Sequence, residues 1–315
     1  MRKALIVGID DYPAKPLAGC IADANALAEA LRRHGDGSPN FDVQLLTSDV
    51  ADTRERNVRA SAKALFNGTP DIALFFFAGH GWVDEAGGYL VTVDSQSPDD
   101  GITMDQILAL ANQSKASKRI IILDCCHAGA FGNPAAAGGR GTMLTAGLSI
   151  MTATRPSEVA VEFGGNGRFT SLLLDGLNGG AADLRGDITP GSLYAYVDEA
   201  LGAWDQRPMF KTNISSFAVL RSVPPKIDPA VLRLITRYFP DRSGEHALDP
   251  SYEFTDPSAD DAKVEIFKHL QQYVAAGLVV PVGEEHMYFA AINSRSCRLT
   301  PVGAQYRRLV AEGRL

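Results

Sequence analysis

Apolar residues gather in short runs along the first two thirds of the chain, and amphipathic helical patterns separate these runs. The runs at residues 72–77 and 119–123 contain almost no polar side chains. Strands that lack a polar face are buried on both sides of a sheet, as in folds whose parallel strands are connected by helices. We therefore expect residues 1–222 to form an α/β domain with a mostly parallel central sheet.

The individual elements of this first domain follow from the same pattern. Strands are expected at residues 4–9, 43–46, 72–77, 119–123 and 148–153, and helices at residues 22–33, 54–66, 104–112, 170–176 and 193–201.

The last third of the chain has a different order of elements. Consecutive prolines at 224 and 225 predict an extended linker, and residues 226–315 follow it as a second domain. Helices are expected at 230–239 and 262–276, strands at 278–282 and 287–293, and a last helix at 300–312. This order predicts a small α+β domain of the winged-helix type.

Composition is that of an ordinary globular protein, with 45% hydrophobic and 21% charged residues. The net charge of −7 argues against nucleic acid held on a general basic face. No apolar run approaches the ~20 residues that span a bilayer, so we expect no membrane association. The four cysteines show no disulfide spacing, which favours reduced thiols and a cytoplasmic location.

Two chemically capable segments follow expected strands of the sheet. Ala78-Gly79-His80-Gly81 comes after the run at 72–77, and Asp124-Cys125-Cys126-His127 comes after the run at 119–123. Ligands of open α/β sheets bind at the carboxyl ends of the strands, where these segments begin. A histidine beside a cysteine can stabilise the reactive thiolate. Taken alone, His80 is best interpreted as a polar residue that ends a strand, and Cys126 as an inert buried thiol. Their matched positions after two strands favour a catalytic pair instead.

These segments resemble the caspase-like peptidases, and most closely their metacaspase and bacterial branch. FFFAGHG is similar to the strand and His-Gly segment of the family, and DCCHAG to its Asp-x-Cys-His-x-Gly segment. Further matches occur in order from ALIVGIDDY near the N-terminus, through GGYLVTVDS and GRFTSLLLDGL, to QRPMF near residue 210. The resemblance implies a caspase-like three-layer sandwich and the activity of a thiol protease.

The resemblance also implies a role for particular residues. Cys126 is the expected nucleophile and His80 the group that protonates the leaving amine. The backbone N–H groups of Gly81 and Cys126 are expected to form the oxyanion hole. His127 is expected to orient the loop rather than to act as the base.

In metacaspases, two aspartates line the pocket for the residue before the scissile bond, and Asp23 and Asp124 occupy the matching positions. Paired carboxylates attract Arg or Lys, so cleavage after basic residues is expected. Two other interpretations stay open at this stage. Asp23 can serve as a favourable charge at a helix N-terminus, and Asp124 can brace a loop.

The Gly- and Ala-rich segment at residues 129–147 lies where caspase-like enzymes often separate their large and small subunits. Arg140 is its only basic residue, which makes Arg140 a candidate for self-processing. A passive loop is the alternative, since loops are commonly mobile.

No metal or cofactor is expected from the sequence. The cysteines and histidines lack zinc-site spacing, and no phosphate-binding loop is present. Some metacaspases respond to calcium, but the acidic pairs Asp99-Asp100 and Asp260-Asp261 do not form an EF-hand pattern.

For the second domain we expect a protein partner. The helix at 262–276 carries Lys263 and Lys268 beside acidic residues, a weak pattern for phosphate binding. A DNA-associated regulator and an inactive caspase-like scaffold are the two alternatives to a working peptidase.

Overall fold

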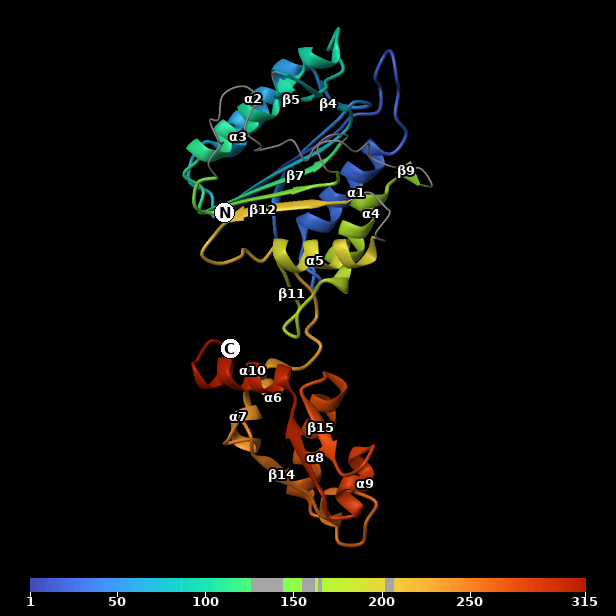
Figure 1. Ribbon diagram of the computed structural model, residues 1–315, viewed down its shortest axis with the longest axis vertical. Helices are drawn as coiled ribbons and strands as arrows, with labels where there is room; N and C mark the ends of the chain where they lie inside the picture. The colour runs from blue at the N-terminus through green and yellow to red at the C-terminus, as the bar shows by residue number, and fades with distance from the viewer. Residues whose placement is uncertain (86, 126–143, 155–161, 164–165, 202–206) are drawn as a thin grey trace. The chain divides into compact units, whose positions relative to one another are not determined.

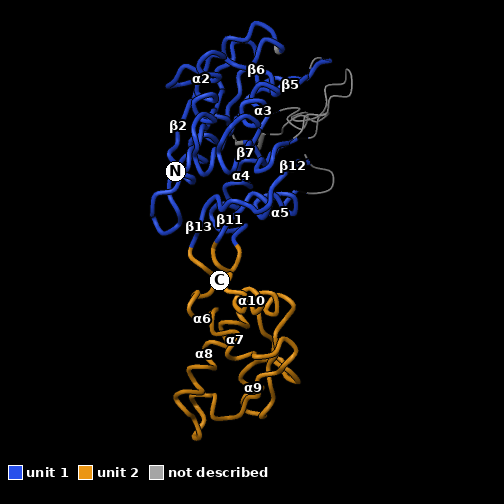
Figure 2. Tube along the Cα trace, turned by 90° about the vertical axis from the view of Figure 1, so that its left-hand side faces the viewer, with its two compact units in different colours: residues 1–182, 187–223 blue, residues 183–186, 224–315 orange. Residues whose placement is uncertain are grey.

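The computed structural model describes residues 1–85, 87–125, 144–154, 162–163, 166–201 and 207–315 (Figure 1). The described chain divides into two compact units, which Figure 2 colours separately. Unit 1 contains residues 1–182 and 187–223, and unit 2 contains residues 183–186 and 224–315.

A six-stranded sheet forms the centre of unit 1, in the order β12-β8-β7-β3-β1-β2. β1, β2, β3, β7 and β8 run parallel, and β12 pairs antiparallel with β8. The predicted mostly parallel sheet is therefore confirmed. The strands are β1 (Arg2–Gly8), β2 (Asp42–Thr47), β3 (Ile72–Ala78), β7 (Lys118–Asp124), β8 (Leu148–Thr152) and β12 (Met209–Asn213).

Helices cover both faces of this sheet and make the domain three layers thick (Figure 1). One face carries α1 (Cys20–Arg32), α4 (Arg168–Asp175), the π-helical segment Gly176–Gly180 and α5 (Pro190–Ala200). The other face carries α2 (Glu55–Phe66) and α3 (Met104–Gln113). None of the helices in the described parts of the chain is both long and apolar enough for a bilayer crossing.

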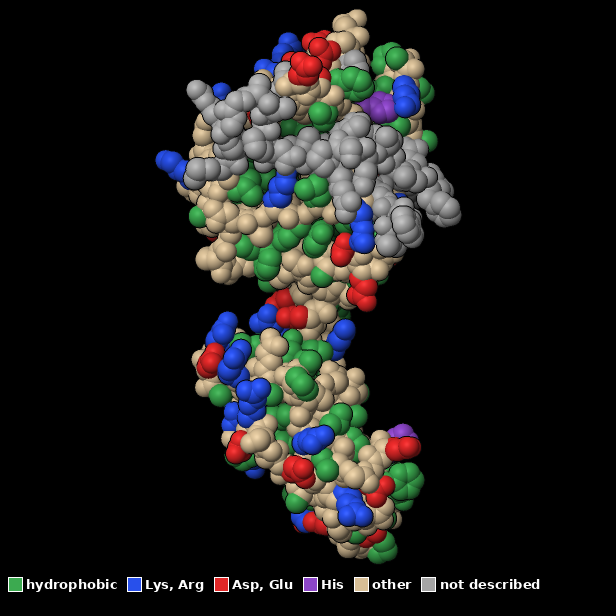
Figure 3. Space-filling view, in the orientation of Figure 1, with side chains coloured by type: hydrophobic (Ala, Val, Ile, Leu, Met, Phe, Trp, Pro, Cys, Tyr) green, Lys and Arg blue, Asp and Glu red, His purple; other side chains and the backbone are tan. Residues whose placement is uncertain are grey.

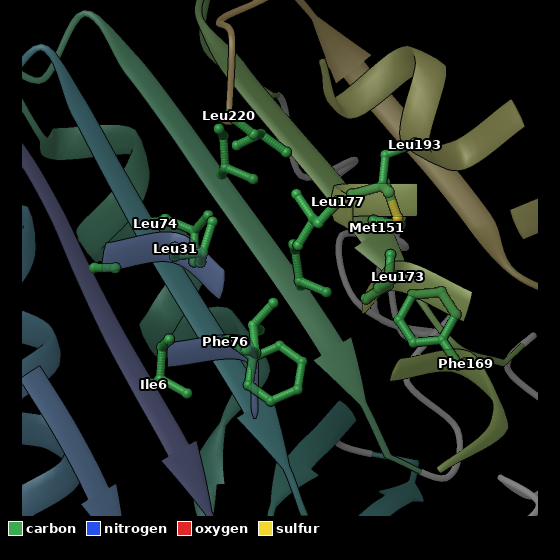
Figure 4. Packing of buried hydrophobic residues seen from close by; sticks show 14 of the residues in the cluster. Ile6, Leu31, Leu74, Phe76, Met151, Phe169, Leu173, Leu177, Leu193 and Leu220 are labelled. Atoms are coloured by element: carbon green, nitrogen blue, oxygen red, sulfur yellow. The ribbon is translucent and has the colours of Figure 1, made fainter. Parts of the chain in front are cut away.

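The strand residues alternate between the two cores. In β3, Leu74 and Phe76 pack with α1 and α4, whereas Phe75 and Phe77 pack on the side of α2 and α3. Figure 4 shows the first of these cores, in which Ile6, Phe76 and Phe169 come from three separate elements. Because successive side chains of a strand point to opposite faces, an uninterrupted apolar run supplies both cores at once.

A second, three-stranded sheet lies beyond the end of β3. It consists of β4 (Gly81–Asp84), β5 (Gly87–Leu90) and β6 (Ile102–Thr103), in the order β4-β5-β6. Short ladders join β9 (Glu162–Phe163) to β10 (Asn166–Gly167), and β11 (Asp187–Ile188) to β13 (Arg221–Ser222). A 3₁₀ turn covers Pro98–Asp100.

Unit 2 has its own core around Tyr273, Phe239 and Leu270. Its antiparallel sheet has the order β14-β16-β15, formed by β14 (Glu245–Ala247), β15 (Val279–Val282) and β16 (Ser296–Leu299). Its helices are α6 (Pro229–Arg233), α7 (Ile235–Tyr238), the 3₁₀ turn Pro250–Tyr252, α8 (Asp261–Ala275), α9 (Met287–Ile292) and α10 (Pro301–Ala311). The winged-helix interpretation of this unit stays a prediction.

The strand predicted at residues 287–293 is wrong, because this segment forms the helix α9. Met287, Ala290 and Ala291 are buried, whereas Tyr288 and Phe289 are exposed. Burial at positions i, i+3 and i+4 is helical periodicity. The strand was predicted because two adjacent aromatic residues are typical of strands. The partner strand of β15 follows later, as β16.

Candidate active site

The register between β3 and β7 brings together the two segments that carry the expected catalytic pair. Ala78 pairs with Asp124 in parallel register, and the Gly79 N–H donates to the Asp124 carbonyl at 3.3 Å. His80 and Cys126 each follow this register pair by two residues. Cys126 lies outside the described residues, and so does Arg140. The two segments therefore leave the sheet from adjacent strand ends.

The imidazole of His80 is held by a backbone carbonyl. Its Nε2 atom lies 2.7 Å from the carbonyl oxygen of Lys15. A carbonyl oxygen can only accept a hydrogen bond, so Nε2 carries a proton in this contact. Nδ1 is then the nitrogen left to exchange a proton with a neighbouring group.

The loop that contains Lys15 is fastened by a single aspartate. The carboxylate of Asp10 accepts from the N–H groups of Cys20 at 2.9 Å and Ile21 at 3.2 Å, at the start of α1. Its backbone carbonyl accepts from Tyr12 and Leu17, both at 2.9 Å. Asp10 thus closes the loop and accepts from two backbone N–H groups that have no partner within the helix. It serves as the cap of α1, because Gly19, the residue directly before the helix, has no side chain to do so.

The backbone N–H of Gly81 points away from the neighbouring strand. Val91 donates to the His80 carbonyl at 3.0 Å, which makes His80 and Val91 a hydrogen-bonded pair, and Gly81 pairs with Leu90 in the next position. Hydrogen-bonded and non-hydrogen-bonded pairs alternate along an antiparallel ladder. Gly81 therefore aims its N–H outward from β4, the edge strand of this sheet.

Asp23 in α1 and Asp124 at the end of β7 converge, although 101 positions (124 − 23) separate them in the sequence. Both are buried, with 3% and 7% of their surface exposed. A methyl group built on Gly167 would lie 2.6 Å from Oδ2 of Asp124 and 2.9 Å from Oδ2 of Asp23. The two carboxylates therefore meet at Gly167, where they approach the backbone so closely that no side chain fits.

The first turn of α4 orients both carboxylates. The Gly167 N–H donates to Asp23 at 2.8 Å, and the Thr170 hydroxyl donates to Asp124 at 2.7 Å. Hydrogen bonds to charged groups contribute about 1.5–3 kcal/mol each, so these donors offset part of the cost of burying two like charges. Asp124 therefore braces α4 as well as facing Asp23.

Cys125 is fully buried in the core next to β7. Its carbonyl accepts from the Thr154 hydroxyl at 3.1 Å, which ties the end of β7 to the segment after β8. Burial is the environment of an inert structural thiol rather than of a nucleophile. Among the described residues, no group of three or more His, Cys, Asp or Glu side chains is placed to hold a metal ion.

Three residues of this region had escaped the sequence interpretation: Asp10, Gly167 and Thr170. They lie in ALIVGIDDY and GRFTSLLLDGL, which predict a strand and a helix. A polar residue directly after an apolar strand was the available signal for Asp10. Nothing local marks Gly167 and Thr170, because their contacts reach Asp23 and Asp124, far away along the chain.

Comparison with known proteins gives one family and several similar structures. The sequence model of the caspase domain family matches residues 1–217. None of the curated proteins compared with the chain matches it significantly.

The structure is similar to that of protein GSU0716 from Geobacter sulfurreducens, with 19% identity and a TM-score of 0.52 over 71% of this chain and 98% of that one. It is also similar to caspase-1 from Spodoptera frugiperda, with 14% identity and a TM-score of 0.52 over 70% of this chain and 90% of that one. These structures share the fold of unit 1. The chain belongs to the caspase domain family.

Proposed function

We propose that this protein is a cysteine endopeptidase that hydrolyses peptide bonds after Arg or Lys, with Cys126 and His80 as its catalytic pair. Its membership of the caspase domain family supports cysteine peptidase activity in general. The observation that carries the proposed pair is the register of Ala78 with Asp124, because it starts both catalytic segments at adjacent strand ends.

The proposed reaction follows from the groups at these strand ends. The Cys126 thiolate attacks the scissile carbonyl and forms a C–S bond, and the imidazolium of His80 gives its proton to the amine as the C–N bond breaks. Water, deprotonated by His80, then hydrolyses the thioester and releases the thiol. The outward N–H of Gly81 supports its proposed place in the oxyanion hole beside the N–H of Cys126.

The convergence of Asp23 and Asp124 supports the preference for basic residues. Two buried carboxylates that converge at Gly167 bring acceptor oxygens of one kind together, and such a pair suits a guanidinium or ammonium group. Their oxygens also accept hydrogen bonds from α4, so the pair is oriented before a substrate arrives.

Turnover of fluorogenic peptides that end in Arg, Lys or Asp tests this proposal. We expect cleavage of the Arg and Lys peptides, and no cleavage by the Cys126→Ala and His80→Ala variants. Activity that survives Cys126→Ala would remove the proposed nucleophile. A folded protein without turnover of any of these peptides would favour an inactive scaffold.

Self-processing after Arg140 is a further part of the proposal, supported by its being the only basic residue between 129 and 147. We expect a fragment that begins at Gly141 in preparations of the wild type and not of Cys126→Ala or Arg140→Gln. The same fragment in the Cys126→Ala preparation would assign the cut to another protease.

For unit 2 we propose binding to a protein rather than to DNA. The ammonium of Lys263 bonds to Asp249 at 2.7 Å and Ser251 at 2.8 Å, and that of Lys268 bonds to Glu265 at 2.5 Å. Both lysines of α8 are thus engaged within the unit, and Figure 3 shows basic side chains interspersed with acidic ones over its visible face. Such a surface neutralises few phosphates.

The exposed aromatic side chains of α9 supply a surface for a protein partner. Tyr288 and Phe289 are 44% and 47% exposed, with ring centroids 5.3 Å apart in an edge-on arrangement. Exposed aromatic clusters are typical of protein interfaces.

A gel shift of duplex DNA by the full-length Cys126→Ala protein that is sensitive to salt and weakened by Lys263→Ala would contradict this assignment. We expect no shift, and we expect the double variant Tyr288→Ala/Phe289→Ala to lose cross-linking to its protein partner.

We propose that the reaction takes place in the cytoplasm and needs no cofactor. None of the three described cysteines forms a disulfide, which fits a reducing compartment. The proposed chemistry uses only side chains of the protein, so peptide turnover in EDTA should equal turnover in calcium. A loss of activity in EDTA that calcium restores would overturn the cofactor-free proposal.

A further inference from the structure

The hydroxyl of Tyr12 occupies a gap in the hydrogen-bond ladder beside His80. The His80 N–H donates to the Tyr12 hydroxyl at 3.0 Å, and this hydroxyl donates to the Val91 carbonyl, also at 3.0 Å. The Val91 N–H in turn donates to the His80 carbonyl at 3.0 Å. The three groups form a closed ring of hydrogen bonds.

In a regular antiparallel ladder this position would contain no side chain. A hydrogen-bonded pair exchanges two direct N–H to carbonyl bonds, and His80 and Val91 make only one of them. The Tyr12 hydroxyl bridges the other and keeps the His80 N–H apart from the Val91 carbonyl. It therefore acts as a spacer that sets the peptide plane of His80.

The local sequence provides room for this spacer. A methyl group on Gly79 would lie 2.4 Å from the Tyr12 oxygen, closer than any real contact of this kind. Tyr12 itself is 6% exposed and packs in the core, with its ring centroid 4.5 Å from that of His80. Burial raises the pKa of Tyr12 well above its ordinary value, which the His80 hydrogen bond only partly offsets, so the hydroxyl keeps its proton.

The loop that contains Tyr12 and Lys15 contacts both the backbone and the imidazole of His80. Lys15 accepts from the imidazole, and Tyr12 accepts from the backbone of the same residue. Asp10 joins these two positions, because its carbonyl accepts from Tyr12 and Leu17 on either side of Lys15. A shift of the His80 backbone would consequently change the distance between its imidazole and Lys15.

We propose that Tyr12 is a positioning residue for the catalytic histidine, acting through its hydroxyl as a spacer between His80 and Val91. The inference rests on the proposed function, because it assumes that His80 acts in catalysis. Without the hydroxyl, the His80 N–H can bond directly to the Val91 carbonyl, and the ladder closes by one more bond. This closure moves His80 away from its working position.

The variant Tyr12→Phe tests the hydroxyl alone, since it keeps the ring that packs on His80. A displacement of about 1 Å in a catalytic group costs on the order of 100-fold in rate. We expect kcat to fall about 10- to 100-fold with KM nearly unchanged. Tyr89→Phe is the matched control: Tyr89 lies in β5, which pairs with the strand that follows His80, no catalytic role is proposed for it, and loss of its hydroxyl should leave kcat unchanged.

A second readout does not depend on turnover. The rate of Cys126 alkylation by iodoacetamide, followed by mass spectrometry against pH, reports the fraction of thiolate that His80 stabilises. We expect Tyr12→Phe to move the midpoint of this profile upward, toward that of His80→Ala. A stability change alone would not move it.

Gly79→Ala disturbs the same hydroxyl without changing Tyr12, so a fall in its kcat tests the inference even if Tyr12→Phe folds poorly. Where both variants fold, a double-mutant cycle completes the test. Gly79→Ala pushes on the hydroxyl, so it should reduce kcat more in the wild-type background than in the Tyr12→Phe background. Equal effects in both backgrounds, or a Tyr12→Phe enzyme with wild-type kcat and alkylation profile, would overturn the inference while His80→Ala still abolished activity. If wild type shows neither turnover nor His80-dependent alkylation, the proposed function fails first.

Discussion

At the scale of single residues, the site depends on polar groups that the chain brings together from distant positions. Asp23 accepts a hydrogen bond from Gly167 and Asp124 accepts one from Thr170, and both carboxylates lie against Gly167. A buried carboxylate that keeps its hydrogen-bond donors is ready to receive a cation without rearrangement. Substrate preference should therefore respond to each of these two charges.

Replacing either aspartate by asparagine tests this preference. We expect Asp124→Asn and Asp23→Asn to lower kcat/KM for an Arg peptide about 10- to 100-fold, because one charged hydrogen bond is lost. The same peptide with Gln in place of Arg should be affected far less. Asp175→Asn, at the exposed end of α4, is the control. Equal losses on the Arg and Gln peptides would show that the aspartates serve the fold rather than specificity.

At the scale of elements, loops after the strands bind the ends of helices and so position the site. Asp10 illustrates this, because it caps α1 from ten residues upstream of Cys20. The same helix carries Asp23, and the same loop carries Tyr12 and Lys15. Local stability and site geometry are therefore linked through one carboxylate.

Asp10→Ala should lower the free energy of unfolding by about 1–2 kcal/mol, the usual cost of a lost helix cap. Urea denaturation measures this change. The matched control is Asp11→Ala, whose exposed side chain contacts Ser48 instead of the helix and should change stability little. If both variants lost the same stability, the capping role would be wrong.

Alkaline pH should destabilise unit 2 through Cys297 in β16. Burial raises the pKa of this thiol from 9.0 to about 12, with a smaller contribution from Glu245. Between these values the unfolded thiol loses its proton and the folded thiol keeps it, so stability is full below pH 9 and falls as pH rises toward 12. The slope for one such group is about 1.4 kcal/mol per pH unit.

Urea denaturation at several pH values between 8 and 11 checks this prediction. Tyr273 and Tyr238 of the same core also have raised pKa values, because burial disfavours their ionised forms. The contribution of Cys297 is therefore the difference in slope between wild type and Cys297→Ala. Identical slopes would exclude it.

At the scale of the whole molecule, the described chain contains two separate sets of core residues. The two cores of unit 1 share one sheet, since each strand contributes to both faces. Unit 2 has a core of its own. Elements that share a sheet are expected to unfold together, and a separate core is expected to unfold separately.

We expect two transitions in calorimetry of the full chain. Leu173→Ala in α4 should lower only the transition of unit 1, and Leu270→Ala in α8 only that of unit 2, each by about 2–5 kcal/mol. Both leucines are fully buried, so the two substitutions are matched. A single transition that both variants shift would mean that the units unfold as one.

The sequence alone predicted the five parallel strands of the sheet and the segments that carry the proposed catalytic residues, but not the antiparallel edge strand β12. Uninterrupted apolar runs such as residues 72–77 have few alternatives to a strand covered on both faces. Periodicity was weaker for the segment at 287–293, where two adjacent aromatic residues imitated a strand and only packing against the rest of unit 2 selected the helix.

The tertiary structure decided which residues from distant parts of the chain are in contact. The parallel register of Ala78 with Asp124, the meeting of Asp23 and Asp124 at Gly167, and the hydroxyl of Tyr12 between His80 and Val91 all join positions far apart in the chain. A local pattern reports which face of an element is buried, because burial follows from the period of that element. It does not report which distant polar group will lie there, because that depends on strand order and register.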